Sequence, residues 1–497
     1  MGGAAVDKKE WVMTATATKT YQLYINGAWI DAAGGQTFPV TNPATGETIA
    51  EVADAGTAEA EAAIRAAHEA FPAWAKRTSD ERAELLHAAF DILKGRIDEH
   101  ARILTLENGK PLAESKGEAT IGAGFVRWNA EEARRTYGEV VPSPAANKRV
   151  LTYRQPIGVV VAITPWNFPY SMITRKIAPA LAAGCTVILR PSSATPLVAI
   201  EIIRAFAEAG FPAGVVNIIT SKSAVAVSKV LAESDLVRKI TFTGSTEVGK
   251  QLMAQAAGTV KKVSLELGGH APMLIFDDAD MEAAAQGAIM SRFRNAGQTC
   301  ICTNRLYVQR SILEPFSQRV AELAKGLKVG NGLDPATKVG PMIDERGFAK
   351  VEDQVRDAVA GGATVLAGGK PAHLDGTLKG YFYEPTILAN VAPDAKILHD
   401  ETFGPALPIV PFDTEEEAIR LANDTPFGLA AYAFTRDIGR IFRVSEGLDY
   451  GIVGINDPVP TAPQIPFGGF KESGLGRENG SMGIGEFMEV KAVSIVL

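Results

Sequence analysis

Short β-rich segments alternate with amphipathic helical segments through the middle of the chain, and this alternation restricts the fold more than any other feature. The pattern is typical of a largely parallel sheet covered by helices. One sheet is too small to hold all the β-rich segments. We therefore predict an α/β protein with two or more sheets, whose strands include residues 186–189, 214–220, 239–244, 271–276, 406–410 and 450–456.

Two regions carry helix signals. In the first, Thr195 can cap the helix, Pro196 takes the first helical position, and Gly210 with Pro212 ends it. In the second, residues 57–136, apolar side chains recur at helical spacing. The aromatic residues of this second region are predicted to pack in the core rather than to form a site.

Composition limits the classes of function. A chain of 497 residues corresponds to three domains of about 150 residues each. A net charge of -7 disfavours nucleic acid as a partner, and no apolar run reaches the roughly 18 residues that would span a membrane. Three cysteines are too few for a disulfide framework and lack metal-ligand spacing, so we expect a cytoplasmic protein without a metal. Residues 1–18 are predicted to be an N-terminal tail.

Cys300 ends a polar, glycine-containing segment that is followed by an apolar strand at 305–309. A cysteine at such a junction is a candidate nucleophile, and the alternative is a small buried apolar residue. The six histidines form no recognisable Cys/His motif. If Cys300 reacts, a group other than histidine must therefore serve as its base.

Two more polar residues occupy unusual backbone settings. Glu266 lies in an apolar strand that ends at a glycine pair, where burial would suit its carboxyl group to proton transfer near neutral pH. A solvent-facing glutamate is the alternative. Asn167 lies between the prolines of Pro165-Trp-Asn-Phe-Pro169, where its amide could stabilise a developing oxyanion. A turn whose asparagine only caps the backbone is the alternative.

Residues 242–249, Phe-Thr-Gly-Ser-Thr-Glu-Val-Gly, predict a strand, a glycine turn and the start of a helix. Free N–H groups and the helix dipole at such a start favour a pyrophosphate. The segment lacks the GxGxxG spacing, so taken alone it is a weak nucleotide signal.

These motifs occur in one order: Pro-Trp-Asn-Phe-Pro, Phe-Thr-Gly-Ser-Thr-Glu-Val-Gly, Leu-Glu-Leu-Gly-Gly and Gly-Gln-Thr-Cys. In this order, from about Tyr21 to the C-terminus, the chain resembles the aldehyde dehydrogenase superfamily, and within it the succinate-semialdehyde dehydrogenases. The resemblance implies two interleaved Rossmann-like α/β domains and a β oligomerisation arm, in a homodimer or homotetramer. The implied division is an NAD(P)-binding domain of 19–138 and 158–267, a catalytic domain of 268–464, and an arm of 139–157 and 480–497.

The resemblance also implies a mechanism. Cys300 would attack the aldehyde as a thiolate, and Asn167 with the Cys300 backbone N–H would stabilise the oxyanion. Hydride would pass to the nicotinamide, and Glu266 would activate the water that hydrolyses the thioester. The residues expected to bind NAD or NADP are Thr164, Trp166, Asn167, Arg190, Ser193, Gly244, Ser245, Leu267, Glu401 and Phe403.

Two departures from the family pattern bear on the cofactor. Arg190 stands where the family usually has lysine, and Ser193 where many NAD-preferring members have glutamate. Loss of the glutamate removes a charge that would repel a 2'-phosphate, and the guanidinium group suits that phosphate. We predict that NADP is accepted and is a candidate for the preferred cofactor. The alternative is that Arg190 only replaces lysine at a ribose hydroxyl.

By the same resemblance, Arg175, Arg294 and Thr461 would bind an anionic tail of the aldehyde in a local cationic pocket. Thr461 stands where the resembling enzymes have a serine, and this difference leaves the length of the aldehyde substrate open. Succinate semialdehyde is the favoured substrate. The alternatives are sulfolactaldehyde and 2-oxoglutarate semialdehyde. The second is included because His270, directly after Leu-Glu-Leu-Gly-Gly, resembles the residue at that position in the enzymes that oxidise 2-oxoglutarate semialdehyde. A surface ion pair is the alternative role of Arg175.

The other two cysteines, Cys302 and Cys185, are predicted to have different roles. Some succinate-semialdehyde relatives use a pair like Cys300 and Cys302 as a redox switch, although i and i+2 side chains of an extended strand need rearrangement to form a disulfide. Cys185 is predicted to lie in the core.

Two rival functions are compatible with this fold. One rival is a catalytically silent protein on this fold, and the intact Cys300, Glu266 and Asn167 argue against it. The other rival is an enzyme that transfers the acyl group of the thioester to CoA or phosphate. Glu266, as a base for water, argues against it.

Overall fold

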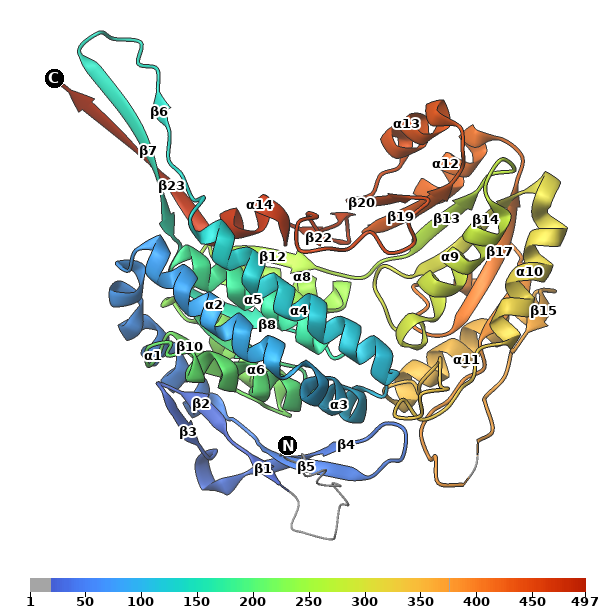
Figure 1. Cartoon of the computed structure of the whole chain (residues 1–497), viewed down its shortest axis with the longest axis horizontal. Helices are drawn as coiled ribbons and strands as arrows, with labels where there is room; N and C mark the ends of the chain where they lie inside the picture. Colours follow the sequence, from blue (N-terminus) through green and yellow to red (C-terminus); the bar gives the residue numbers. More distant parts are fainter. Residues whose placement is uncertain (1–18, 375) are drawn as a thin grey trace, which may run out of the picture.

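A computed structural model describes residues 19–374 and 376–497. It has two α/β lobes, each built around a mainly parallel sheet, and a β sheet that projects from the first lobe (Figure 1). The predicted α/β fold with more than one sheet is confirmed. The predicted N-terminal tail, residues 1–18, lies outside the described residues.

The first lobe contains an eight-stranded sheet of order β22-β12-β11-β8-β9-β10-β2-β3. Strands β8 to β12 pair in parallel, whereas β2, β3 and β22 pair antiparallel. The strands are β2 Leu23–Ile25, β3 Ala28–Ile30, β8 Val159–Ile163, β9 Thr186–Arg190, β10 Val216–Ile218, β11 Val237–Thr243, β12 Lys262–Glu266 and β22 Gly474–Leu475.

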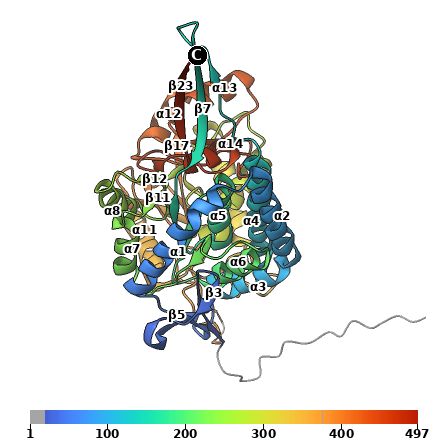
Figure 2. The same cartoon turned by 90° about the vertical axis from the view of Figure 1, so that its left-hand side faces the viewer.

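Helices cover both faces of this sheet (Figure 2). Alternate residues of β8 show why the strand is apolar throughout, because Val160 packs into one core and Val161 into the opposite one. The helices are α1 Thr57–Ala75, α2 Ser79–Gly95, α3 Ile97–Asn108, α4 Leu112–Ala133, α5 Pro169–Ala183, α6 Leu197–Glu208, α7 Ala224–Glu233 and α8 Thr246–Ala257.

The helical region predicted at 57–136 is confirmed by α1 to α4, but the predicted start of α6 is wrong in detail. The helix begins at Leu197, and the Thr195 side chain does not cap it. The cap is the carboxylate of Glu107, which accepts hydrogen bonds from the backbone N–H groups of Leu197 (2.7 Å) and Val198 (2.9 Å). A cap supplied from another helix leaves no local signal in the sequence.

The second lobe contains a seven-stranded sheet of order β15-β16-β17-β14-β13-β19-β20, parallel except for the edge strand β15. Its strands are β13 Ala271–Ile275, β14 Thr303–Gln309, β15 Thr364–Ala367, β16 Thr386–Ala389, β17 Ala406–Phe412, β19 Ala430–Phe434 and β20 Ile452–Ile455. Its helices are α9 Met281–Phe293, α10 Leu313–Lys325, α11 Glu345–Ala360, α12 Glu415–Asn423 and α13 Ile438–Gly447.

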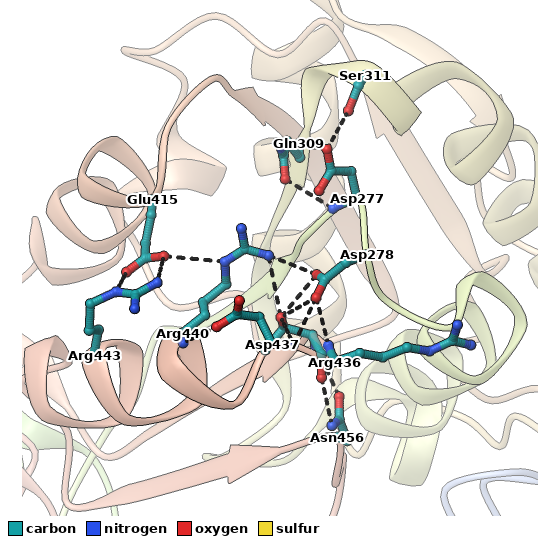
Figure 3. A network of polar contacts seen from close by, with 11 residues as sticks. Asp277, Asp278, Gln309, Ser311, Glu415, Arg436, Asp437, Arg440, Arg443 and Asn456 are labelled. Atoms are coloured by element: carbon teal, nitrogen blue, oxygen red, sulfur yellow. Dashed lines mark hydrogen bonds and ion pairs between the residues drawn. The ribbon is translucent and has the colours of Figure 1, made fainter.

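A polar network closes the carboxyl end of β13 (Figure 3). Asp278 accepts hydrogen bonds from the Thr435 hydroxyl (2.8 Å) and from the backbone N–H of Asp437 (2.9 Å), and it pairs with Arg440 at 2.7 Å. Arg440 also pairs with Glu415 at 3.2 Å. The network ties β13 to α12 and α13 at the end of the strand opposite the Gly268–Gly269 turn, so it stabilises the lobe away from Cys300.

The projecting sheet has the order β23-β7-β6 and is antiparallel (Figures 1 and 2). It contains β6 Val140–Val141, β7 Lys148–Pro156 and β23 Met488–Val496, which lie within the ranges 139–157 and 480–497. The remaining short elements are β1 Thr20–Tyr21, β4 Thr37–Thr41, β5 Thr48–Ala53, β18 Phe427–Gly428, β21 Phe470–Lys471, α14 Gly480–Gly483 and the 3-10 turns Ala33–Gly35, Arg294–Gly297, Arg310–Ile312, Lys396–Leu398 and Ile484–Phe487. Among the helices of residues 19–374 and 376–497, none is long and apolar enough to cross a membrane.

Candidate active site

Cys300 lies in a turn before β14, at a cavity of about 210 Å³ between the two lobes. Helices α4 and α5 of the first lobe form one wall, and the segment that leads to Cys300 forms the other. That segment is sharply folded, because Asn295 (φ 50°) and Ala296 (φ 54°) have left-handed backbone conformations. The residues that line the cavity include Phe168, Met172, Arg175, Arg294, Cys300, Ile301, Thr461 and Phe467.

The Cys300 side chain is partly accessible from this cavity. Desolvation raises the pKa of its thiol to about 12, and the Arg175 guanidinium is the largest effect in the opposite direction. The thiol is therefore protonated in the protein alone at neutral pH. A nucleophilic role requires that positive charge or a proton acceptor favour the thiolate during the reaction.

Glu266 is the last residue of β12 and is buried, so the solvent-facing alternative is wrong. Its Oε2 has no hydrogen-bond partner within the described part of the chain. Burial, and then the Glu478 carboxylate, raise the pKa of Glu266 well above its ordinary value, while Arg175 and Lys176 oppose the shift. A buried carboxyl group with a raised pKa can exchange a proton near neutral pH.

Asn167 is buried in the turn between β8 and α5. Its Nδ2 donates to the backbone carbonyl of Gln298 at 3.1 Å, and Gln298 precedes Cys300 by two residues. Its Oδ1 has no partner in the described residues. The amide nitrogen therefore faces the segment that carries Cys300, as an oxyanion donor must.

The substrate residues predicted from the sequence meet in the same cavity. Arg175 forms an ion pair with Glu478 at 2.5 Å and lies over the ring of Phe467 at 4.2 Å. Both charged side chains are only 5% exposed, so the surface ion-pair alternative for Arg175 is wrong. Lys176 contacts the other carboxylate oxygen of Glu478. Arg175 therefore presents a partly neutralised charge to the cavity.

Arg294 differs from Arg175 in its partners. Its guanidinium lies over the Phe168 ring at 5.1 Å, and within residues 19–374 and 376–497 it forms no ion pair. Glu114 and Glu118 also line the cavity, so the expected cationic pocket is in fact of mixed charge. Arg294 is thus the guanidinium with the greater capacity to bind an anion from solution.

A second hollow, of about 560 Å³, reaches the other side of the Asn167 turn. Six predicted cofactor residues line it, namely Trp166, Asn167, Gly244, Ser245, Glu401 and Phe403. Asp344, Arg346 and Lys350, at the start of α11, line it as well and were not predicted.

Four of these residues show how the second hollow is built. Ser245 caps α8 through a hydrogen bond from the Val248 N–H, which leaves the helix start facing the hollow. Glu401 accepts a hydrogen bond from the Gly269 N–H at 2.9 Å, and burial raises its pKa to about 7. The rings of Trp166 and Phe403 meet edge to face at 5.6 Å.

A third hollow, of about 170 Å³, lies between β8 and α8 and includes Arg190. Arg190 is buried, its Nε has no partner among the described residues, and burial lowers its pKa to about 10. Thr164 is also buried with an unpartnered hydroxyl, Ser193 is half-buried in the turn after β9, and Leu267 packs against Gly249. Unpartnered buried donors and a free helix start fit the phosphates and ribose hydroxyls of a dinucleotide.

Cys302 lies in a turn rather than in the extended strand that the sequence suggested. It is buried, and its sulfur contacts Arg292 Nη1 at 3.2 Å and the Gly297 carbonyl at 3.3 Å. Cys185 lies in the first core, as predicted. All three cysteines are free thiols. Among the residues described, no group of three or more His, Cys, Asp or Glu side chains is arranged to hold a metal ion.

The aldehyde dehydrogenase family model matches residues 29–493, and the chain belongs to the aldehyde dehydrogenase family. It is therefore an oxidoreductase of a family that acts on aldehydes with NAD(P)+. Its sequence is 51% identical to the 3-sulfolactaldehyde dehydrogenase of Pseudomonas putida (95% of this chain, 96% of the relative). It is also 51% identical to the succinate-semialdehyde dehydrogenase [NADP(+)] of Escherichia coli (96% and 98%). A crystal structure of an E. coli NADP-dependent enzyme matches with a TM-score of 0.94 at 50% identity (96% and 98%).

Proposed function

We propose that this enzyme oxidises an aldehyde with an anionic tail, with succinate semialdehyde as the favoured substrate and NADP or NAD as hydride acceptor. One observation carries the proposal: Cys300 shares a small cavity with Arg294 and Arg175, whereas six of the ten predicted cofactor residues line a separate hollow. A charged tail and a reactive carbonyl can therefore be held within one cavity. Sulfolactaldehyde is the second candidate, because sulfonate also suits guanidinium groups and a relative of that name is 51% identical.

The proposed mechanism assigns each step to a residue. The Cys300 thiol first releases its proton to solvent through the cavity. The thiolate sulfur then attacks the carbonyl carbon, and the Asn167 amide with the Cys300 backbone N–H stabilises the oxyanion. The residues of the second and third hollows would hold NAD(P)+, which serves as the hydride acceptor when bound. Glu266 then takes a proton from the water that attacks the thioester, and the raised pKa of its carboxyl group suits it to that task.

The organisation of the chain is proposed on the same basis. The NAD(P)-binding domain would comprise 19–138 and 158–267, the catalytic domain 268–464, and the arm 139–157 and 480–497. The long free edge of β23 supports the proposal that the arm joins subunits into a homodimer or homotetramer. Three free cysteines are compatible with a cytoplasmic location.

A comparison of cofactors tests the role of Arg190. We expect kcat/KM with NADP to equal or exceed that with NAD. The Arg190→Met variant should lose roughly tenfold or more with NADP and much less with NAD, because only the 2'-phosphate makes a charge-assisted contact. Arg127→Met, which removes an exposed arginine of α4, is the control. A wild-type preference for NAD of about tenfold or more, which is 1.4 kcal/mol, would reverse the assignment.

A panel of aldehydes tests the anionic tail. It comprises succinate semialdehyde, glutarate semialdehyde as a longer homologue, 2-oxoglutarate semialdehyde, sulfolactaldehyde and butanal. Arg294→Leu should raise KM for the best anionic aldehyde about 100-fold, since a lost charge-assisted pair is worth a few kcal/mol, and should leave butanal within about threefold. Arg294→Lys should recover part of the loss. Equal effects on charged and neutral aldehydes would eliminate a tail-binding role for Arg294.

A further inference from the structure

The turn that carries Asn167 is held from behind by the junction of α3 and α4. Pro165 and Pro169 have no N–H groups, so neither end of the turn can donate a backbone hydrogen bond to a neighbouring strand. Its carbonyl groups are bound instead by side chains of this junction. Asn108 Nδ2 donates to the Trp166 carbonyl at 2.9 Å, and Lys110 Nζ donates to the Asn167 carbonyl at 2.6 Å.

Lys110 is the centre of this support. Its side chain is fully buried, pairs with Glu118 at 2.5 Å and lies over the Phe168 ring at 3.9 Å. An isolated buried ammonium group is strongly unfavourable, so its partners fix its position closely. The Asn167 carbonyl is therefore bound to a charge that has little freedom to move.

Glu118 extends the support to the start of α5. Its Oε1 accepts hydrogen bonds from the backbone N–H groups of Tyr170 (2.9 Å) and Ser171 (3.2 Å), while Oε2 binds Lys110. A carboxylate at the first N–H groups of a helix also interacts favourably with the helix dipole. The Lys110–Glu118 pair thus holds both the Asn167 carbonyl and the start of the helix that follows the turn.

The Asn167 carbonyl, which Lys110 binds, also contacts the segment that carries Cys300. Asn295 Nδ2 donates to the Asn167 carbonyl at 2.9 Å, and the Asn295 N–H donates to Glu114 at 2.8 Å. The Asn167 amide in turn donates to Gln298 at 3.1 Å. Any shift of the turn would therefore change the distance between the Asn167 amide and the Cys300 segment.

We propose that Lys110 and Glu118 are positioning residues that hold the Asn167 amide at the distance from Cys300 which oxyanion stabilisation requires. This inference rests on the proposed role of Asn167 as oxyanion donor. Neither residue contacts the reacting atoms in this account, because they act through the backbone of the turn. A shift of about 1 Å in such a donor is enough to lower a rate by two orders of magnitude.

A double-mutant cycle with Asn167 tests this proposal. Lys110→Met should lower kcat about 10- to 100-fold per reactive Cys300, counted by thiol titration, and leave KM for the aldehyde within about threefold. Asn167→Ala alone should lower kcat about 100- to 1,000-fold. In the Asn167→Ala background, Lys110→Met should cost less than about threefold more, because the donor that it positions is already absent.

Lys239→Met is the matched control. Lys239 also has a fully buried side chain, but it pairs with Glu486 at 3.3 Å and lies near Phe487 instead of the Asn167 turn. It should match Lys110→Met in loss of melting temperature and keep near wild-type kcat. Glu118→Gln, which keeps an acceptor for the α5 N–H groups, repeats the test if Lys110→Met does not fold.

Two results would overturn the proposal. One is a loss of kcat in Lys110→Met no larger than in Lys239→Met. The other is an additive cycle, in which Lys110→Met has its full effect without the Asn167 amide. If Asn167→Ala itself keeps wild-type kcat, the oxyanion role assigned under the proposed function fails first, so the two failures are distinguishable.

Discussion

Replacing Cys300 with alanine is expected to lower kcat/KM for aldehyde oxidation by at least about 10⁴-fold, which is the scale measured when a covalent nucleophile is removed. The Cys300 side chain is only partly buried at the edge of the core and the change removes one atom, so the folded protein should keep its melting temperature within a few degrees. Cys185→Ala is the control, because this buried cysteine contacts the Phe487 carbonyl and not the cavity.

Steady-state assays of both variants with NADPH absorbance check this result. Iodoacetamide should label one fewer reactive thiol in Cys300→Ala and should leave the labelling of Cys185→Ala unchanged. Activity of Cys300→Ala above about one-tenth of the wild-type rate is incompatible with a covalent mechanism at this residue.

The Glu266→Gln variant is expected to give one rapid turnover of NADPH per active site and then almost stop. Thiol attack does not need the Glu266 carboxylate in this account, whereas hydrolysis of the thioester does. Steady-state kcat should fall about 100- to 10,000-fold, the range of a lost general base. Stopped-flow absorbance measures the burst, and Glu114→Gln, in the same cavity, should show continuous turnover as the matched control.

The pH dependence of hydrolysis follows from the raised pKa of Glu266. The carboxyl group accepts a proton only when it is ionised, and burial favours its neutral form. The wild-type hydrolysis rate should therefore rise with pH through this raised pKa and then level off. Glu266→Gln should lack that rise. A kcat profile with the same rise in both enzymes would remove Glu266 from the base role.

The sheets and the segment that carries the nucleophile could be predicted because a few consecutive residues encode each of them. The strand that ends at Glu266 and the glycine turn before α8 are each encoded within a few consecutive residues. Cys300, Arg294 and Arg175 could be grouped in one cavity from the sequence only through the resemblance to a family, since composition carries no information about distance.

The sequence did not reveal the buried ion pairs of the site. Lys110 pairs with Glu118 across the start of α4. Arg175 and Lys176 both pair with Glu478, which follows Lys176 by 302 positions. A single charged residue in a sequence is usually solvated, so none of these had a local signal of burial. The only hint at Lys110 is its place in Asn108-Gly-Lys-Pro111, between two helical segments where the chain must turn.

Mass spectrometry of the trapped intermediate tests the central claim most directly. Glu266→Gln is mixed with succinate semialdehyde and NADP+, quenched in acid after the burst, and digested. We expect a mass increase of one succinyl group on the peptide that contains Cys300, in an amount equal to the NADPH burst. An NADPH burst with an unmodified Cys300 peptide, or with the acyl group on another residue, would contradict it.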